Sequence, residues 1–294
     1  MRVLTGYVFC LLALGTTLWG TVYAIWDLSS GTWTWKSLCI FFGSYFLILT
    51  GVTGGYHRYL THHAFEFTAV GRWIARPFLL WAGCLSWQST PIWWAAVHRQ
   101  HHQDADGEGD PHSPVPRRSG WWWRIWQFLW AHMLWVPHAR PDIARFAALR
   151  KVDWLEWFFH YGYPAVGPLF GLAFTFWLWG LGGMAWYLAA VFVVWHLTGL
   201  INSLTHLGDV VGYGQSLAKD HSTNIWWLAL LTFGEAFHRH HHARQSSPRL
   251  ADAWWERPFD IGYLEILFLR GCGLVRKLHI PKPAQLEARL AAVP

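Results

Sequence analysis

Four groups of histidines are the residues in this chain whose type and spacing suit chemistry. Two groups have the pattern H-x-x-H-H, one is a pair five residues apart, and one histidine follows an asparagine by four positions. The nine residues are His57, His62, His98, His101, His102, His206, His238, His241 and His242. On a helix, positions i, i+3 and i+4 share a face, so each H-x-x-H-H cluster is expected to aim three imidazoles at one point. The nine together predict a site for two metal ions.

The pair His57 and His62 has a different geometry. Residues five apart diverge by more than a third of a turn on an α-helix, so each ring is expected to approach a metal separately from a helix end. Imidazole shells suit iron, copper, zinc or nickel better than magnesium or calcium, and an incomplete shell leaves a position open for oxygen. Whether His112 and His240 bind metal is left undecided. The other histidines are interpreted as hydrogen-bonded or surface residues: His63, His132, His138, His160, His196, His221 and His279.

Several carboxylates lie close in sequence to these clusters. They are Asp104, Asp106, Glu108, Asp110 and Glu235. A metal-binding imidazole usually donates its second N–H to such a group, so some are expected to hold the histidines in place. For Asp106 and Glu108 an exposed acidic loop is an equal alternative.

Four uncharged, apolar segments are long enough to cross about 30 Å of hydrocarbon. They cover residues 3–25, 37–56, 158–179 and 184–205, and Gly180, Gly182 and Gly183 predict a tight hairpin between the last two. The first segment is longer than the core of a secretory signal peptide, which disfavours cleavage. Residues 77–97 are predicted to be interfacial or re-entrant, and residues 121–136 to form an amphipathic surface helix.

Positive charge fixes the expected orientation. Of 23 Lys and Arg residues, all but Arg2 and Lys36 lie between Arg58 and Lys151 or after Lys219, which predicts that these regions and both termini are cytoplasmic. The expected fold is therefore a single domain, residues 1–294, of the all-α integral membrane class. Four transmembrane helices carry a cytoplasmic cap, residues 57–157 and 206–294, that holds the metal site.

Composition excludes other classes. The 25 tryptophans suit a membrane interface, and the net charge of +6 is not concentrated in a patch that suits nucleic acid. The cysteines form no C-x-x-C pair, so a disulfide framework is not expected. Because the chain has no dinucleotide motif and no haem motif, reducing power must come from another protein.

The histidine boxes resemble those of the membrane fatty acyl desaturases, particularly the stearoyl-CoA and bacterial delta-9 branch. The likeness runs from about residue 54 to 275 and includes the N-S-x-x-H element at Asn202 and the D-P-H element at Asp110. The resemblance implies two irons held by the nine histidines, with Asn202 contacting one iron through water. It also implies oxygen-dependent insertion of a cis double bond, at delta-9, into a saturated acyl chain, with acyl-CoA the expected substrate and acyl-lipid or acyl-carrier protein the alternatives.

The same resemblance implies a bent acyl tunnel and external partners. Gln88, Trp94 and Thr198 match the family's tunnel residues, whereas Gly199 stands where some relatives carry tryptophan. The implied donor is a ferredoxin, rubredoxin or cytochrome b5 type protein with its reductase, and the implied location is a bacterial inner membrane, among its lipids.

Two alternatives remain at this point. A related di-iron hydroxylase, acetylenase or terminal-alkene-forming enzyme would use the same histidines. A membrane haem protein or a divalent-metal transporter would use them for binding alone, but it would place histidines inside the spans, where only His196 lies deep.

Overall fold

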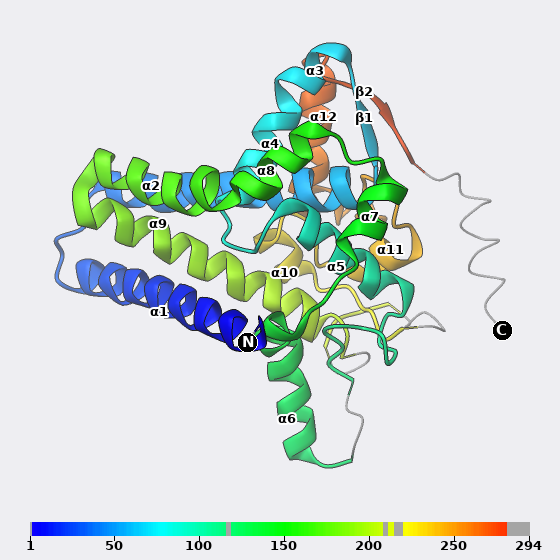
Figure 1. Cartoon of the computed structure of the whole chain (residues 1–294), viewed down its shortest axis with the longest axis horizontal. Helices are drawn as coiled ribbons and strands as arrows, with labels where there is room; N and C mark the ends of the chain where they lie inside the picture. Colours follow the sequence, from blue (N-terminus) through cyan, green and yellow to red (C-terminus); the bar gives the residue numbers. More distant parts are fainter. Residues whose placement is uncertain (1, 116–118, 208–210, 215–219, 281–294) are drawn as a thin grey trace.

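The computed structural model describes residues 2–115, 119–207, 211–214 and 220–280, and it is mostly helical (Figure 1). Its α-helices are α1 (Arg2–Ser29), α2 (Trp35–Leu49), α3 (Ala69–Trp73), α4 (Ala75–Cys84), α5 (Pro91–Gln103), α6 (Trp121–Leu129), α7 (Ile143–Arg150), α8 (Trp154–Pro164), α9 (Phe170–Leu204), α10 (Trp226–Leu231), α11 (His238–Ala243) and α12 (Ile261–Gly271). The π- and 3-10 helices are η1 (Thr50–Thr61), η2 (Trp130–Leu134), η3 (Val136–His138), η4 (Ala165–Leu169) and η6 (Arg257–Phe259).

The chain is mostly helical, as predicted, and it also contains one short pair of strands. Strands β1 (Phe65–Phe67) and β2 (Val275–Leu278) pair antiparallel, with Phe65 opposite Leu278. Phe65 and Phe67 point into the core while Glu66 points outward. The strand pairing gives hydrogen-bond partners to backbone groups that have none within a helix. This pair joins segments more than 200 residues apart in sequence.

In the described part of the chain, three helical stretches are long and apolar enough to cross a membrane: Gly6–Ser29, Trp35–Thr61 and Trp154–Leu204. The first two overlap the predicted segments 3–25 and 37–56. As one straight helix, the 51 residues of the third would extend about 77 Å, more than twice the thickness of the hydrocarbon. The helix is instead broken at Trp179 and Gly180, where φ is +60° at the glycine, and the chain doubles back there (Figure 1). The break lies at the start of the predicted glycine hairpin.

The spanning helices pack closely through small residues. Helices α1 and α2 both contact α9, and η1 contacts α4. At Gly51 a Cβ atom would lie 2.0 Å from the backbone nitrogen of Gly83, so the backbones of η1 and α4 touch and a larger residue does not fit at this position. This contact holds the end of the second span firmly against the cap.

The remaining helices cover one end of the bundle (Figure 1). The predicted interfacial segment 77–97 falls on two helices, α4 and α5, with irregular chain between them, and so is not one spanning helix. Helix α6, on the predicted surface segment 121–136, projects from the body, and none of its side chains is buried. The predicted cap includes residues 281–294, which lie outside the described part of the chain.

Candidate metal centre

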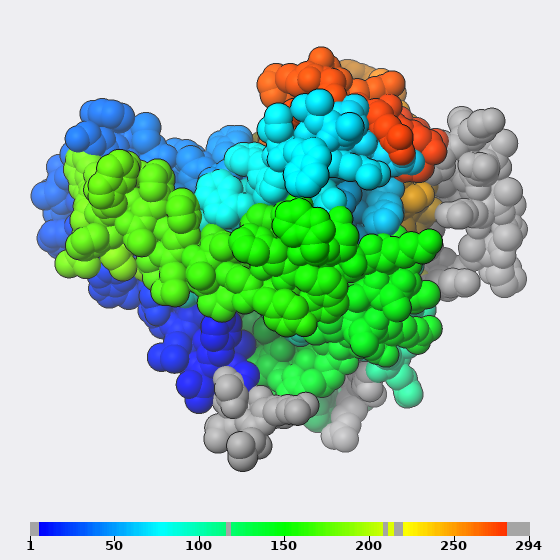
Figure 2. Space-filling model, turned by 45° about the horizontal axis from the view of Figure 1, so that its top comes forward, coloured from blue at the N-terminus to red at the C-terminus, as the bar shows by residue number. Residues whose placement is uncertain are grey.

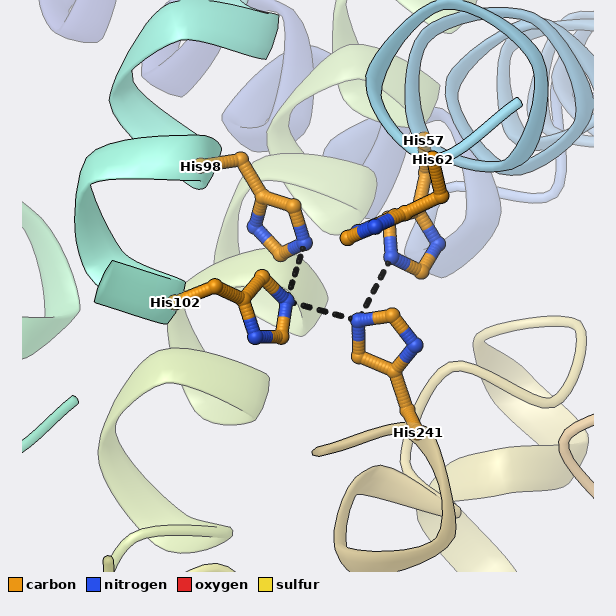
Figure 3. A group of neighbouring side chains, drawn as sticks. All are labelled: His57, His62, His98, His102 and His241. Atoms are coloured by element: carbon orange, nitrogen blue, oxygen red, sulfur yellow. Dashed lines mark hydrogen bonds between the residues drawn. The ribbon is translucent and has the colours of Figure 1, made fainter. Parts of the chain in front are cut away.

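The nine predicted histidines meet at one end of the bundle in two groups. The five-histidine group consists of His57, His62, His98, His102 and His241, shown in Figure 3. The four-histidine group consists of His101, His206, His238 and His242. Within each group one ring nitrogen of every residue lies within 4.8 Å of the others. Two adjacent pockets of imidazole nitrogens are the arrangement that two metal ions need.

Each H-x-x-H-H cluster divides between the two groups, which corrects the expectation that all three rings aim at one point. On α5, His98 and His102 face the five-histidine group, whereas His101 faces the other. Residues 98, 101 and 102 spread over about 100° of the helix circumference, wide enough for two neighbouring sites. On α11 the division is reversed, because His241 joins the five-histidine group alone.

His57 and His62 both belong to the five-histidine group, contrary to the expectation that each ring approaches a metal separately. The segment between them is the π-helix η1, and the His62 N–H donates to the His57 carbonyl at 3.1 Å. A π-helix bonds residues five apart, so it brings together two side chains that an α-helix would separate by about 140°. π-Helical turns often occur at functional sites.

Short contacts between Nε2 atoms define both groups. In the five-histidine group the His57–His241, His98–His102 and His102–His241 distances are 3.0, 3.0 and 2.8 Å (Figure 3). In the four-histidine group three further Nε2 pairs lie 2.9 to 3.2 Å apart. Two nitrogens bound at right angles to one ion, each about 2.1 Å from it, are separated by about 3.0 Å. The nitrogens are therefore spaced as ligands of shared ions.

The carboxylates around the site strengthen this interpretation. Nδ1 of His101 contacts Asp110 at 2.9 Å, and Nδ1 of His242 contacts Asp220 at 3.1 Å. When each Nδ1 donates its proton to the carboxylate, the two Nε2 atoms present lone pairs to each other at 3.2 Å. Facing lone pairs repel unless a cation lies between them. His62 adds to the argument, because both of its ring nitrogens are buried with no hydrogen-bond partner among the described residues.

Two predicted carboxylates hold further histidines. Asp106 contacts Nδ1 of His206 at 3.0 Å, and Glu235 contacts Nδ1 of His57 at 2.5 Å. The exposed-loop alternative for Asp106 is thus wrong, since its side chain is 5% exposed. Glu108 is exposed, and Asp104 accepts the Gly109 N–H within its own loop.

Asp220 was not foreseen from the sequence. It lies 22 residues from His242 in a loop without histidine-box spacing, and only the fold brings its carboxylate to Nδ1 of that histidine. The only sequence signal is its position directly before His221, which resembles many surface acidic residues.

Burial sets the protonation of the centre. Loss of water and repulsion between neighbouring imidazoles lower the pKa of His98, His102 and His241 well below the usual value. Burial alone would raise the pKa of Asp110 and Asp220, but contact with His101 and His242 lowers both. Neutral imidazoles beside ionised carboxylates are the states that favour metal binding.

The structure gives different surroundings to His240 and His112, the two histidines whose role the sequence left undecided. His240 points away from both groups and contacts Asn224, Asp252 and Glu256. His112 is buried beside Asp110 and His101, so it belongs to the surroundings of the four-histidine group.

The predicted tunnel residues form a hydrogen-bonded chain beside the histidines. The Trp94 indole N–H donates to the Gln88 amide oxygen at 3.3 Å, and the Gln88 amide nitrogen donates to the Thr198 hydroxyl at 3.0 Å. Asn202 is half-buried one turn before His206. A Cβ atom at Gly199 would lie 2.7 Å from the His132 carbonyl oxygen, so η2 occupies the space beside this glycine.

Comparison with known families identifies the group. The model of the fatty acid desaturase family matches residues 31–259. The chain belongs to this family. Among curated desaturases, delta-9 acyl-lipid desaturase 2 of Arabidopsis thaliana is 34% identical, over 93% of this chain and 84% of its own length. The sn-1 stearoyl-lipid 9-desaturases of Synechocystis and Anabaena variabilis are 33% and 34% identical, over 84% and 80% of this chain and 73% and 80% of their own lengths.

The desaturase family, the buried histidine groups and the long apolar helices agree with one another. The chain is a membrane-associated fatty acyl desaturase, an oxidoreductase of lipid metabolism that acts on a fatty acyl lipid and has a site suited to metal. The alternative of a metal or haem protein without enzymatic activity is thereby excluded.

Proposed function

We propose that this desaturase is an oxygen-dependent, di-iron enzyme that introduces a cis double bond at delta-9 of a saturated acyl chain. The observation that carries the proposal is the contact between the tunnel residues and the histidines: Trp94 stacks on His98, which belongs to the five-histidine group. A methylene held against Trp94 would thus lie close to the metal-binding nitrogens.

The residues proposed to hold the irons are the nine histidines, with Asn202 contacting one iron through water. When bound, the irons would supply the oxygen-activating chemistry that removes two hydrogens from the acyl chain. The protein's part is positioning: Asp106, Asp110, Asp220 and Glu235 orient four of the imidazoles. Exclusion of water follows from burial, since His57, His101, His206 and His241 are at most 3% exposed.

The Gln88–Thr198 hydrogen bond would fix the path of the acyl chain. It joins the loop after α4 to α9, beside the hydrogen bonds that Tyr187 and Trp195 of α9 donate to backbone carbonyls of the same loop. A rigid bend at this point would place one C–C bond at the metal, and each buried methylene would contribute about 0.8 kcal/mol of affinity. A fixed bend in the acyl chain would favour a cis double bond, and a single C–C bond at the metal would give one double-bond position.

For the acyl carrier we propose a glycerolipid, because the named relatives are acyl-lipid and stearoyl-lipid desaturases. Acyl-CoA, expected from the resemblance of the boxes, and acyl-carrier protein are the alternatives to test. The proposed electron donor is a ferredoxin, rubredoxin or cytochrome b5 type protein with its reductase.

The proposed topology has four spans in one domain, with 158–179 and 184–205 as separate passes on either side of the Gly180 break. Both termini and the metal centre would then lie on the cytoplasmic side of a bacterial inner membrane, where the Lys and Arg residues of the cap concentrate.

The decisive experiment is gas chromatography with mass spectrometry of total fatty acids from cells expressing the chain. A new monoene is expected, absent when His241→Ala and His242→Ala are combined and retained in the matched control His240→Ala, whose ring lies outside both groups. Sorting the monoene by lipid class and by acyl-CoA pool identifies the carrier. A hydroxylated product would instead support the hydroxylase alternative, and lipids unchanged by an iron-loaded, reduced enzyme would contradict the proposal.

A further inference from the structure

A pocket of about 570 Å³, separate from the histidine groups, opens between the strand pair, α3, α4, η1 and the junction of α7 and α8. Figure 2 shows these segments, coloured cyan, green and red, meeting on one face. The pocket shares no lining residue with the two histidine groups or with the predicted tunnel residues. Its volume is that of a small-molecule site.

Basic side chains outnumber acidic ones on its wall. Arg72, Arg76, Arg150 and Lys151 line the pocket, together with the imidazoles of His63 and His279. The lining carboxylates are Glu66, Asp153 and Glu156.

Each of these carboxylates already has cationic partners. Glu66 contacts Arg276, Lys277 and His279 at 2.5 to 3.4 Å. Asp153 and Glu156 both pair with Arg76. The two carboxylates on Arg76 share one guanidinium, whereas Glu66 has two cationic partners, Arg276 and Lys277, that lie outside the lining. Across the lining and these two partners, six Lys and Arg side chains face three carboxylates, so positive charge is in excess.

The excess charge lies on Arg72, Arg150 and Lys151, for which the described residues provide no carboxylate within 4.0 Å. Arg72 and Lys151 are exposed, so a ligand can reach them. Arg150 is half-buried and fixed, because its Nε and Nη2 donate to the Leu60 carbonyl at 3.3 and 3.0 Å. Burial and the nearby Arg99 lower the pKa of Arg150 to about 10, which leaves the guanidinium charged at neutral pH in a positive surrounding.

We propose that this pocket binds a phosphate group, carried by a phospholipid headgroup or free in solution. A fixed guanidinium, two accessible cations and the His63 imidazole line the pocket as donors, and a tetrahedral phosphate offers three or more acceptor oxygens to match them. The pocket is larger than one phosphate, and Tyr59, Phe65 and Phe67 on its wall leave apolar surface for an attached organic group. The site is independent of catalysis and would hold its ligand whether or not the enzyme turns over.

The test is binding of three probes to the purified full-length protein in detergent at constant ionic strength. The probes are inorganic phosphate, dihexanoyl phosphatidylglycerol and dihexanoylglycerol, and binding is followed by the shift in thermal unfolding and by titration. Arg150→Gln is expected to weaken phosphate binding about tenfold or more, through loss of a charge-assisted contact. Arg145→Gln, an exposed arginine on the same helix but outside the pocket, is expected to bind as the unaltered protein does.

Arg72→Gln is the second variant, needed because Arg150 also supports the Leu60 carbonyl and its loss alters the fold locally. Weaker binding in both pocket variants at equal iron content supports the site. Binding of the phospholipid alone, or of inorganic phosphate as well, identifies the source. Equal binding by dihexanoylglycerol, absence of saturable binding by both inorganic phosphate and the phospholipid, or unchanged affinity in both variants overturns the proposal. None of these readouts needs desaturation, so failure here is distinguishable from failure of the proposed reaction.

Discussion

The indole of Trp94 lies nearly parallel to the imidazole of His98, with ring centroids 5.1 Å apart and planes inclined by 25°. One side chain thus contacts a predicted metal ligand through its face and Gln88 through its N–H. Trp94 therefore belongs both to the wall of the proposed tunnel and to the wall of the metal centre. It lies one turn before His98 on α5.

Trp94→Phe separates these two contacts. The phenyl ring keeps a face on His98 but loses the hydrogen bond to Gln88, whose contribution is about 1 kcal/mol. We expect unchanged iron content and about a fivefold shift in product ratio toward neighbouring double-bond positions. Mass spectrometry of derivatised monoenes measures the ratio. Lost iron with an unaltered product position would show that Trp94 supports the metal instead of the acyl chain.

Asp220→Asn tests the carboxylate that only the fold reveals. Removing the charge that orients His242 should weaken metal affinity about 10- to 100-fold, with the fold retained. The matched control is Asp252→Asn, because Asp252 contacts His240, which belongs to neither group. Iron retained against a graded chelator is the measurement, and equal retention by the two variants would contradict the role given to Asp220.

As the pH falls, we expect iron to be released at a lower pH than it would be from exposed histidines. The pKa values of His98, His102 and His241 are lowered by burial, so protons compete with metal only below the usual range near 6.5. In the unfolded chain these imidazoles take up protons near their usual pKa, so the metal-free fold loses stability as pH falls through that value. We expect the midpoint of iron loss below about pH 6, measured by metal analysis with circular dichroism as the folding control. A midpoint at pH 6.5 or above would show that the imidazoles are not buried as described.

Gly199→Ala places a methyl group against the backbone of His132. Because the added Cβ lies 2.7 Å from a carbonyl oxygen, η2 must shift, at a cost of about 1–3 kcal/mol in unfolding free energy. Gly43→Ala, on α2 with open space around it, should be neutral or stabilising by up to about 1 kcal/mol. Thermal unfolding in detergent compares the two. Equal stability would mean that η2 moves aside for the added methyl group without cost.

The sequence by itself determined the chemistry and the approximate helices. Nine histidines at helical spacing, beside segments whose length matches the hydrocarbon core, gave the donor type, the number of ions expected and their place at helix ends, because side-chain chemistry and local periodicity are properties of short stretches. The glycines at 180–183 marked the chain reversal because a left-handed backbone conformation favours that residue locally.

Only the tertiary structure decided how the histidines are shared. Which of His98, His101 and His102 faces which group depends on the rotation of α5 against its neighbours, and the meeting of His57 with His62 depends on a π-helix that propensities do not signal. Asp220 and His242 are 22 positions apart and Gln88 and Thr198 are 110 apart. The lining of the basic pocket around Arg150 runs from Tyr59 to His279, 220 positions. Contacts over such separations are selected by packing of whole elements, so no local pattern in the sequence could specify them.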